Sequence, residues 1–447
     1  MYELARMYAP ASRRSSGTKV SLLRTLARVA VVGTVAAAYM IPALAGVVAV
    51  RAVRGRARAR VFLYRRIVRM LQALGPTYVK YGQIAGSRRD ALPSELCDAL
   101  SVLHDGVAPM SVRQSRRALR TAYGSELTKL FPTVDEKPVA SGSIACVYRA
   151  VQADGKVVAL KLKRPGIDAR MRADLDLVRR MVRMAEGSAK MGGMPVGELA
   201  GYVSAAILGQ LDFAKEAANS VRLRGILKPV KDVQVPTLIG EHSRPECLVF
   251  EYIPDLDSTT AEDLPYGVRA RLAGTVLAAA QKMMFVDGFV HCDLHPGNLY
   301  LTKDARVVIL DAGYSVQLPD RVRRLMGEYW MRLRAGDGRR CGEIVLESAV
   351  AVGDDTDVDA FVSAVEDLVN TIVGSGVQFD MFTFGNKLFD LQREYGIYAA
   401  SDFAFPLMSL LILEGTVRGI SPDVDFRQVG AQVGEKSPAQ AQAPVTT

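Results

Sequence analysis

The chain has 447 residues, of which 49% are hydrophobic and 23% charged, so it is long and apolar enough for two or three packed domains and is not a disordered polymer. Its formal net charge is +10, but residues 1–70 hold fourteen Lys or Arg and one Glu, so the remainder carries a net −3. Basic residues confined to one end around an apolar stretch favour an anionic membrane surface as partner and argue against nucleic acid.

The five cysteines lie far apart, form no CxxC pair and are odd in number. This spacing excludes a complete disulfide framework and fits a reducing cytosol, so we expect free thiols. Cys146 and Cys292 fall within loops described below, where a reactive thiol could respond to oxidation, whereas a buried cysteine acts only as a small apolar group.

The first predicted element is an apolar segment, residues 29–50, which has no charge and would be about 33 Å long as a helix. It is a candidate membrane span. Pro42, with Gly33 and Gly46 to either side, also allows a kinked or re-entrant hairpin, and the alanine-rich composition allows a buried or interfacial helix.

A secretory signal is a further alternative for this segment, because Ala43-Leu44-Ala45 resembles a cleavage site. The stretch ahead of the apolar run is long for a signal. Eight arginines follow between Arg51 and Arg69, against six basic residues before the segment. This excess places the downstream domain on the cytoplasmic face of the cell membrane.

Residues 71–130 have mostly helical patterns interrupted by prolines, and two β-rich runs follow at residues 143–151 and 156–164 around a turn signal. Helices are then predicted at residues 169–189 and 196–224. Residues 248–254 have the pattern of a buried strand that ends at a hinge between lobes, and the last residues have the composition of a disordered tail.

Small residues precede the strand at 156–164 and form a candidate phosphate-binding loop, Ala140, Ser141, Gly142 and Ser143. Small side chains let backbone N–H groups approach phosphate oxygens. Within the strand, the sequence VVALK ends at Lys161, which occupies the place of the lysine that contacts nucleotide phosphates in kinases. Alternation puts Lys163 on the same strand face, so periodicity does not choose between them, and the VVAL register favours Lys161.

The sequence HCDLHPGN at residues 291–298 and LDAG at residues 310–313 have the residue types and spacing of a kinase catalytic loop and metal-binding loop. A helical pattern at residues 270–288 precedes them, and two short strands flank Asp304 between them. Asp293 is the candidate catalytic carboxylate, and Asn298 with Asp311 is the candidate Mg²⁺ ligand pair.

The stretch LGPTYVKYGQ, which includes Lys80, Gly82 and Gln83, resembles the KxGQ signature of the UbiB-like, or aarF-domain, atypical kinases. The resemblance continues in the family's order from Leu71 to Gly430, through ASGSIACVYRA, ALKLKRPGI, QLDFAKEAANSVR, HCDLHPGN, LDAG and LILEGTVRGISPDVDF.

This resemblance implies an α+β, bilobal protein-kinase-like fold with a helical extension over the active site. It divides the chain into a basic N-terminal region, a KxGQ extension, an N-lobe with a helical insert, a C-lobe and a disordered tail, at residues 1–70, 71–135, 136–254, 255–434 and 435–447.

By position in the family's motifs, Lys161 contacts phosphate, Glu216 is its helix partner and Glu251 belongs to the nucleotide-binding set. Lys80 and Gln83 stand where a peptide substrate would dock. Asp212 belongs to an acidic pair that gates the site.

The sequence departs from the family pattern in three motifs. Gln210 replaces the first member of the acidic pair, so Lys80 would have only Asp212 for an ion pair. Ala312 replaces the phenylalanine that follows the metal-binding aspartate. The small-residue loop contains Gly142, with Cys146 in place of a glutamine.

The resemblance implies ATP and Mg²⁺ as cofactors, and a membrane lipid or prenylated quinone precursor as partner, with lipid-biosynthesis enzymes and a homodimer as further partners. The leading hypothesis is a membrane-associated kinase or ATPase that supports prenyl-lipid metabolism. A protein kinase and a catalytically silent nucleotide-binding scaffold are the alternatives.

Overall fold

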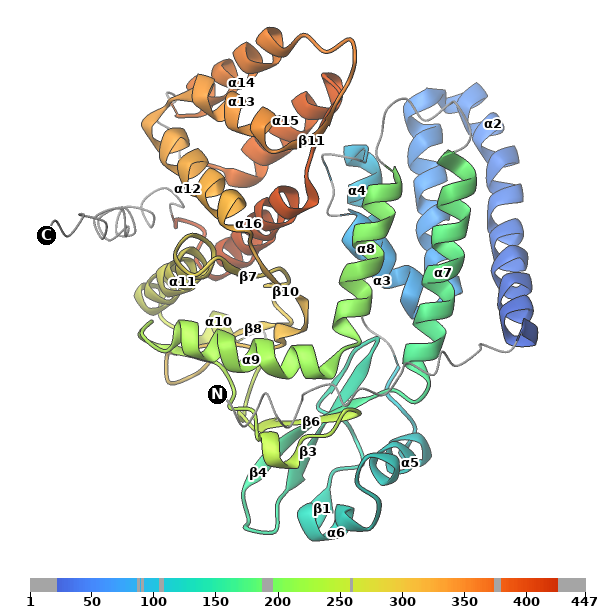
Figure 1. Cartoon of the computed structure of the whole chain (residues 1–447), viewed down its shortest axis with the longest axis vertical. Helices are drawn as coiled ribbons and strands as arrows, with labels where there is room; N and C mark the ends of the chain where they lie inside the picture. Colours follow the sequence, from blue (N-terminus) through green and yellow to red (C-terminus); the bar gives the residue numbers. More distant parts are fainter. Residues whose placement is uncertain are drawn as a thin grey trace, which may run out of the picture. The chain divides into compact units, whose positions relative to one another are not determined.

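The structure is a computed structural model that describes residues 22–86, 89, 92–103, 108–186, 196–257, 260–373 and 379–424. The chain forms two compact units (Figure 1). The N-unit comprises the residues up to Ala218 together with Thr237–Tyr252, and the C-unit comprises Asn219–Pro236 and the residues from Ile253 onward. Many helices and small sheets make up both units, which confirms the predicted α+β class. The predicted tail at 435–447 lies outside the described residues.

The apolar segment belongs to helix α2 (Leu22–Leu74), which folds back on itself as a helical hairpin (Figure 1). The reversal is at Gly55, whose φ of 83° and ψ of 172° interrupt the helix, and Pro42 lies inside the first arm. A Cβ atom on Gly46 would lie 2.7 Å from the ring of Phe62, so the two arms pack closely. Residues 29–50 therefore form a single helical arm and not the hairpin that the sequence allowed within them, and the turn is made by a glycine outside this segment.

Arg28, near the start of the hairpin, joins its base both to the buried Asp174 and to the hairpin's other end. The Nε of Arg28 lies 2.5 Å from Oδ1 of Asp174, a side chain with no exposed surface, and Nη2 of Arg28 donates to the carbonyl of Leu74 at 3.0 Å. Thr77 donates to the same carboxylate at 2.8 Å. Close to these bonds, Val32 packs with Leu74, Tyr78 and Val178 in a small apolar cluster. The base of the hairpin is therefore an integral part of the N-unit.

The helical extension continues with α3 (Pro76–Gly86), α4 (Ser94–Leu100), α5 (Val112–Tyr123) and α6 (Leu127–Leu130). Gly82 of the KYGQ stretch is required by packing, because a Cβ atom there would lie 2.5 Å from Leu103 and 2.9 Å from Leu71. Ser111 and Gln114 form a capping box at the start of α5.

The sheet of the N-unit is antiparallel in the order β1-β3-β4-β6, with β2 paired to β3. Its strands are β1 (Thr133–Val134), β2 (Ala140–Ser141), β3 (Ala145–Val151), β4 (Val157–Lys163) and β6 (Cys247–Glu251). Alternate residues of β3 and β4, such as Tyr148 and Leu160, are buried against Phe131 and Leu119. Alternation therefore sets which face of β4 carries its lysines.

Helices α7 (Ile167–Glu186), α8 (Val196–Gln210) and α9 (Phe213–Leu227) lie between β4 and β6 in the sequence. The single helix predicted for residues 196–224 is wrong, because the chain breaks at Leu211 and Asp212. The carboxylate of Asp212 accepts from the N–H groups of Ala214 and Lys215 at 3.0 and 3.1 Å, which starts a new helix. An aspartate inside an otherwise apolar helical pattern was the signal for this break.

The C-unit contains two long hydrophobic helices, α11 and α16, and three small sheets. Its helices are α10 (Thr260–Asp263), α11 (Tyr266–Gln281), a π-helical turn (Lys282–Val286), α12 (Asp320–Ala335), α13 (Gly338–Glu347), α14 (Val358–Val373), α15 (Met381–Glu394) and α16 (Ser401–Ile420). Its strands are β5 (Val233–Gln234), β7 (Phe289–His291), β8 (Leu299–Leu301), β9 (Val307–Ile309), β10 (Ser315–Gln317), β11 (Ala349–Val352) and β12 (Ile397–Ala399).

A buried carboxylate joins two of these helices. Glu414 of α16 has no exposed surface and accepts from the backbone N–H groups of Met381 and Phe382 at the start of α15, at 3.0 and 2.6 Å. Burial raises the pKa of Glu414, and Arg418 one turn later pairs with it at 3.0 Å. The LILEGTVRG stretch therefore has a structural role in holding α15 against α16.

Candidate functional site

The structure separates the two lysines that strand periodicity left equivalent. Nζ of Lys161 lies 2.6 Å from Oε1 of Glu216 on α9, and their side chains are 15% and 2% exposed. Lys163 instead donates to the carbonyl of Leu211 at 2.6 Å and lies 3.3 Å from Asp168. The pairing that the family resemblance implies for Lys161 is thus present. Lys163 holds the end of α8 to the sheet.

The predicted phosphate-binding loop is partly a strand. Ala140 and Ser141 form β2 and pair with Val147 and Cys146 of β3, and the N–H of Gly142 donates to the carbonyl of Ala145 at 2.9 Å. The expectation of a four-residue loop is therefore corrected to a tight hairpin with Gly142 and Ser143 at its turn. The backbone hydrogen bond between Gly142 and Ala145 closes the turn and restricts its conformation.

Other residues predicted for the nucleotide and gating sites also lie in the N-unit. Glu251 ends β6, and its carboxylate accepts from the N–H and hydroxyl of Thr237 at 3.1 and 2.9 Å. Lys80 on α3 is 7% exposed, and Gln83 donates to the carbonyl of Leu103 at 3.1 Å. Asp212 serves as the cap of α9. The gating roles of Lys80, Gln83 and Asp212 stay predictions.

The catalytic loop lies in the C-unit and begins at the end of β7. The ring of His291 is buried: its Nδ1 accepts from the N–H of Asp293 at 3.2 Å, and its Nε2 donates to the carbonyl of Leu310 at 3.0 Å. The side chain of Asp293 is 26% exposed. His291 therefore orients the backbone that presents the Asp293 carboxylate and links it to the metal-binding loop.

The two candidate metal ligands are brought together through Leu310. Nδ2 of Asn298 donates to the carbonyl of Asp293 at 3.0 Å, which leaves its amide oxygen as the candidate ligand. The N–H of Leu310 donates to the carbonyl of Asn298 at 2.8 Å, and Asp311 is the next residue. Antiparallel pairing of β8 with β9 sets this register, with Leu299 opposite Ile309. The predicted strands and turn are thus what aligns Asn298 with Asp311.

Asp311 has a backbone conformation that few residues other than glycine adopt. Its φ of 55° and ψ of 75° are left-handed, and its side chain accepts from the N–H of Gly313 at 3.1 Å. Such a conformation costs about 1–3 kcal/mol and is typical of functional loops. Ala312, which is 2% exposed, has its carbonyl bonded to Asn219 at 3.1 Å. A hydrogen bond from α9 therefore holds this loop in place at the position where the resemblance implies a phenylalanine.

Two residues at the site were missed in the sequence. Nδ1 of His295 accepts from the N–H of Gly297 at 2.9 Å, and its Nε2 lies 3.6 Å from Oδ1 of Asp293. The second histidine of HCDLHPGN could have suggested this role. Asn219 gave no signal, because its bond to Ala312 joins residues that are far apart in the sequence.

Neither loop cysteine has the environment of a reactive thiol. All five cysteines are free and buried, which confirms the expectation of no disulfides. Burial raises the pKa of the Cys292 thiol to about 12, so the reactive thiolate is scarce at neutral pH.

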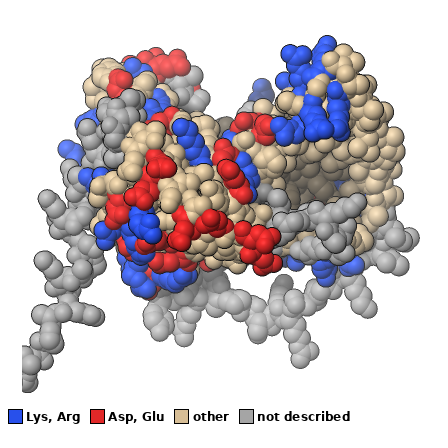
Figure 2. All heavy atoms as spheres, turned by 90° about the horizontal axis from the view of Figure 1, so that it is seen from above, with Lys and Arg blue, Asp and Glu red and all other residues tan. Residues whose placement is uncertain are grey.

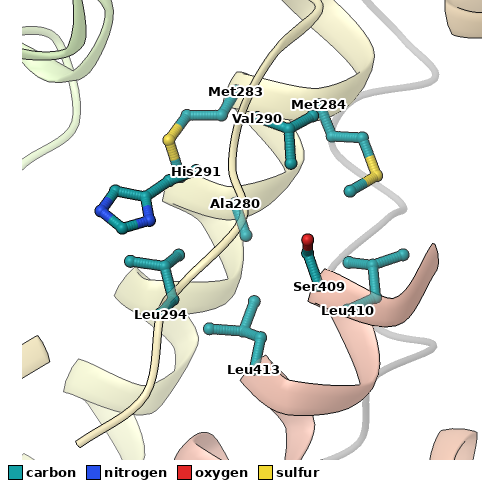
Figure 3. A pocket seen from close by; sticks show the side chains of 9 residues that line it. All are labelled: Ala280, Met283, Met284, Val290, His291, Leu294, Ser409, Leu410 and Leu413. Atoms are coloured by element: carbon teal, nitrogen blue, oxygen red, sulfur yellow. The ribbon is translucent and has the colours of Figure 1, made fainter. Parts of the chain in front are cut away.

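A small cavity lies behind the catalytic loop (Figure 3). It has a volume of about 10 Å³ and is lined mainly by apolar side chains of the α11 region and α16, including Met283, Met284, Leu410 and Leu413. This is room for about one water molecule. The cavity is too small for a nucleotide or a prenyl group, so we treat it as a packing defect.

The family described as ABC1 atypical kinase-like domain matches residues 102–345, more than half of the chain. The chain belongs to this family. The match includes the Lys161–Glu216 pair and both loops of the C-unit, and it confirms the predicted kinase-like fold and the resemblance to UbiB-like kinases.

Curated members of the ABC1 family extend the similarity over most of the chain. "Probable protein kinase UbiB" of Aeromonas hydrophila is 30% identical over 376 residues, which cover 81% of this chain and 68% of that protein. A Shewanella protein of the same name is 29% identical over 393 residues, with coverages of 85% and 70%. A solved complex of Rv3197 with erythromycin from Mycobacterium tuberculosis has a TM-score of 0.53 and 21% identity, covering 78% of this chain and 90% of that one. It supports the fold alone.

The donor set of this ABC1 domain fits Mg-ATP. Mg²⁺ usually takes one or two protein ligands and completes its shell with water and substrate phosphates. Among the described residues no group of three His, Cys, Asp or Glu side chains gathers as a self-sufficient metal site. An amide oxygen and one carboxylate, from Asn298 and Asp311, are therefore suited to a metal that arrives with a nucleotide.

We expect Lys161→Ala to weaken Mg-ATP binding or turnover by about tenfold or more. The variant removes both the contact to phosphate and the positive charge that pairs with Glu216. Since Glu216 is buried, the same change should lower the free energy of unfolding by about 3 kcal/mol. Calorimetry with Mg-ATP and urea unfolding measure the two effects. Lys163→Met is the matched control, and a larger nucleotide effect from it than from Lys161→Ala would mean that the wrong lysine was chosen.

We also expect the free energy of unfolding to decrease as the pH falls below about 6.5, because burial lowers the pKa of His291 in the folded protein while the unfolded chain keeps the ordinary value. Above that pH the ring is neutral in both states and has no effect. Below it, the unfolded state binds the extra proton. Urea unfolding between pH 5 and 7.5 should show a shallower slope for His291→Asn, and equal slopes would contradict this assignment.

Proposed function

We propose that this ABC1-family protein is a membrane-associated atypical kinase or ATPase that binds Mg-ATP and supports isoprenoid quinone or other prenyl-lipid biosynthesis or transport. The observation that carries the catalytic part is the joining of the catalytic and metal-binding loops at Leu310, which aligns Asn298 with Asp311. The Lys161–Glu216 pair of the N-unit supplies the phosphate contact.

Each residue would have a distinct part in the reaction. Asn298 and Asp311 would hold Mg²⁺, which neutralises phosphate charge when it is bound. Asp293 would orient or deprotonate the acceptor hydroxyl, or a water in the ATPase case. His291 and His295 keep the Asp293 carboxylate in place through the backbone and through the 3.6 Å approach to Oδ1.

The α2 hairpin supports the membrane part of the proposal. Along its first arm Ile41, Leu44 and Val48 are 67%, 60% and 70% exposed at helical spacing, so one apolar face is uncovered. The turn carries the exposed arginines Arg51, Arg54, Arg56, Arg58 and Arg60. Figure 2, which views the molecule from above, shows basic side chains gathered over this helix. An apolar face beside arginines suits the headgroup region of an anionic bilayer.

The contact between the two ends of the hairpin favours an interfacial position over a straight span across the membrane. Two helical stretches of the described residues are long and apolar enough to cross a membrane. The most apolar part of Arg28–Leu74 is 11% buried, whereas that of Asp402–Ile420 is 76% buried and belongs to the core. Because Arg28 and Leu74 meet at the base, a span would have to carry the arginine-rich turn through hydrocarbon. Arginine at the centre of a bilayer is costly. We place the hairpin against the cytoplasmic face of the membrane.

One alternative, a protein kinase, is favoured by the name "Probable protein kinase UbiB" of the relatives. A second alternative, a silent nucleotide-binding scaffold, is suggested by Ala312 and Gln210. Against the scaffold, Asp293, Asn298 and Asp311 are all retained, and hydrogen bonds hold each of them in its loop.

ATP turnover by the full chain, measured with and without liposomes that contain anionic lipid and candidate prenyl phenols, tests the proposal. We expect Mg²⁺-dependent turnover that rises several-fold when lipid and prenyl phenol are both present. Absence of nucleotide uptake in calorimetry would end the catalytic proposal. A rate of ATP turnover that none of the lipids changes, together with phosphate transfer to a protein substrate, would favour the protein kinase.

A further inference from the structure

The side chain of Arg164 makes three hydrogen bonds around the β2–β3 hairpin. Its Nε donates to the carbonyl of Gly142 at 2.9 Å, and its Nη2 donates to the hydroxyl of Ser141 at 2.9 Å and to the carbonyl of Ala108 at 2.8 Å. The Ser141 and Gly142 acceptors belong to the hairpin that we assign to phosphate binding. Ala108 belongs to the helical extension.

The backbone of Arg164 is independently fixed. Its N–H donates to the carbonyl of Ile144 at 2.8 Å, next to the hairpin, and Pro165 and Gly166 then turn the chain into α7. Gly166 has a φ of 73°, which suits glycine. The guanidinium therefore projects from a rigid turn, and its planar donors engage acceptors from two separate segments.

The bond to Gly142 has a directional consequence. In a trans peptide the C=O and the following N–H point to opposite sides. Because the Gly142 carbonyl points toward the Arg164 guanidinium, the N–H of Ser143 in the same peptide points away from that guanidinium. In a phosphate-binding hairpin the useful groups are backbone N–H donors, and their orientation decides whether they can reach an anion.

We propose that Arg164 is a positioning residue that sets the β2–β3 hairpin for phosphate binding and makes its conformation depend on the seating of the extension at Ala108. This inference deepens the proposed function and rests on it for the nucleotide part. A shift of the Ala108 segment removes one acceptor from the guanidinium, and the hairpin loses part of its restraint. The extension thereby acts on nucleotide affinity through a side chain that does not touch the nucleotide.

The first test needs no nucleotide. Hydrogen exchange of the full chain should show the amides of residues 139–146 exchanging about tenfold faster in Arg164→Gln than in the parent, a factor that corresponds to about 1.4 kcal/mol. Arg164→Lys should fall between them, because an ammonium replaces only part of the planar donor set. Arg116→Gln, which removes an exposed ion pair with Glu136 in the same unit, is the control and should leave these amides unchanged.

The second test is kinetic. Arg164→Gln should raise the KM for Mg-ATP by about tenfold while kcat changes by less than about threefold, since the catalytic loop is untouched. Unchanged exchange of residues 139–146 would overturn the restraint itself. Faster exchange with an unchanged KM would overturn the link to phosphate. If the parent takes up no nucleotide, the proposed function fails, and the exchange result still decides whether Arg164 restrains the hairpin.

Discussion

The Asp293→Asn variant should bind Mg-ATP with nearly the affinity of the parent and turn it over at least about a hundredfold more slowly. The substitution removes the carboxylate that would orient or deprotonate the acceptor. It leaves in place the backbone N–H that donates to His291 and the carbonyl that accepts from Asn298. The loop should therefore keep its shape. Calorimetry for binding and phosphate release for turnover are the two measurements.

Asp304→Asn is the matched control, because this side chain is 59% exposed in the turn between β8 and β9 of the same unit. It should turn over ATP as the parent does. If Asp293→Asn kept turnover within a few-fold while still binding nucleotide, the chain would be a nucleotide-binding scaffold and the catalytic assignment would be wrong.

Replacing Arg51, Arg54, Arg56 and Arg58 by Gln should weaken binding to anionic liposomes by roughly a thousandfold. Each basic residue near a negatively charged bilayer contributes about 1 kcal/mol, so four contribute about 4 kcal/mol. These side chains are exposed at the turn of the hairpin, and the Arg28–Asp174 pair at its base is left intact. Sedimentation with liposomes of increasing anionic lipid content measures the effect.

Four exposed basic residues of the C-unit, Lys303, Arg324, Arg334 and Lys387, provide a control with the same change in net charge. Their replacement by Gln should alter binding far less. Equal losses from the two sets would mean that total charge, and not the hairpin, brings the protein to the membrane. Undiminished binding of both variants would move the docking surface elsewhere.

Local patterns predicted the strands and turn around the candidate catalytic loop because these parts are close in the sequence. HCDLHPGN, the two short strands and LDAG form one contiguous stretch, and strand pairing alone aligns Asn298 with Asp311. The pairing of Lys161 with Glu216 spans 55 residues. It came from family resemblance, since alternation left Lys161 and Lys163 equivalent.

The features that were missed depend on contacts between distant segments or on a single backbone angle. The hydrogen bond from Asn219 to Ala312 joins residues 93 positions apart, and the hydrogen bond from Arg164 to Ala108 joins residues 56 positions apart. The helix break at Asp212 arises because its carboxylate caps the start of α9, although the apolar pattern of the sequence continues through this position. The reversal of α2 depends on the φ of Gly55, whereas the sequence pointed to Pro42, which the helix accommodates.

The ion pair between Arg28 and Asp174 governs how the protein can be shortened. Deletion of residues 1–70 removes the guanidinium of Arg28, and of the two side chains that donate to the buried Asp174 carboxylate in this cluster it leaves only Thr77. An isolated buried charge of this kind costs about 3–5 kcal/mol. A fragment lacking the hairpin should therefore be soluble and well folded only when Asp174 is also replaced by a neutral residue.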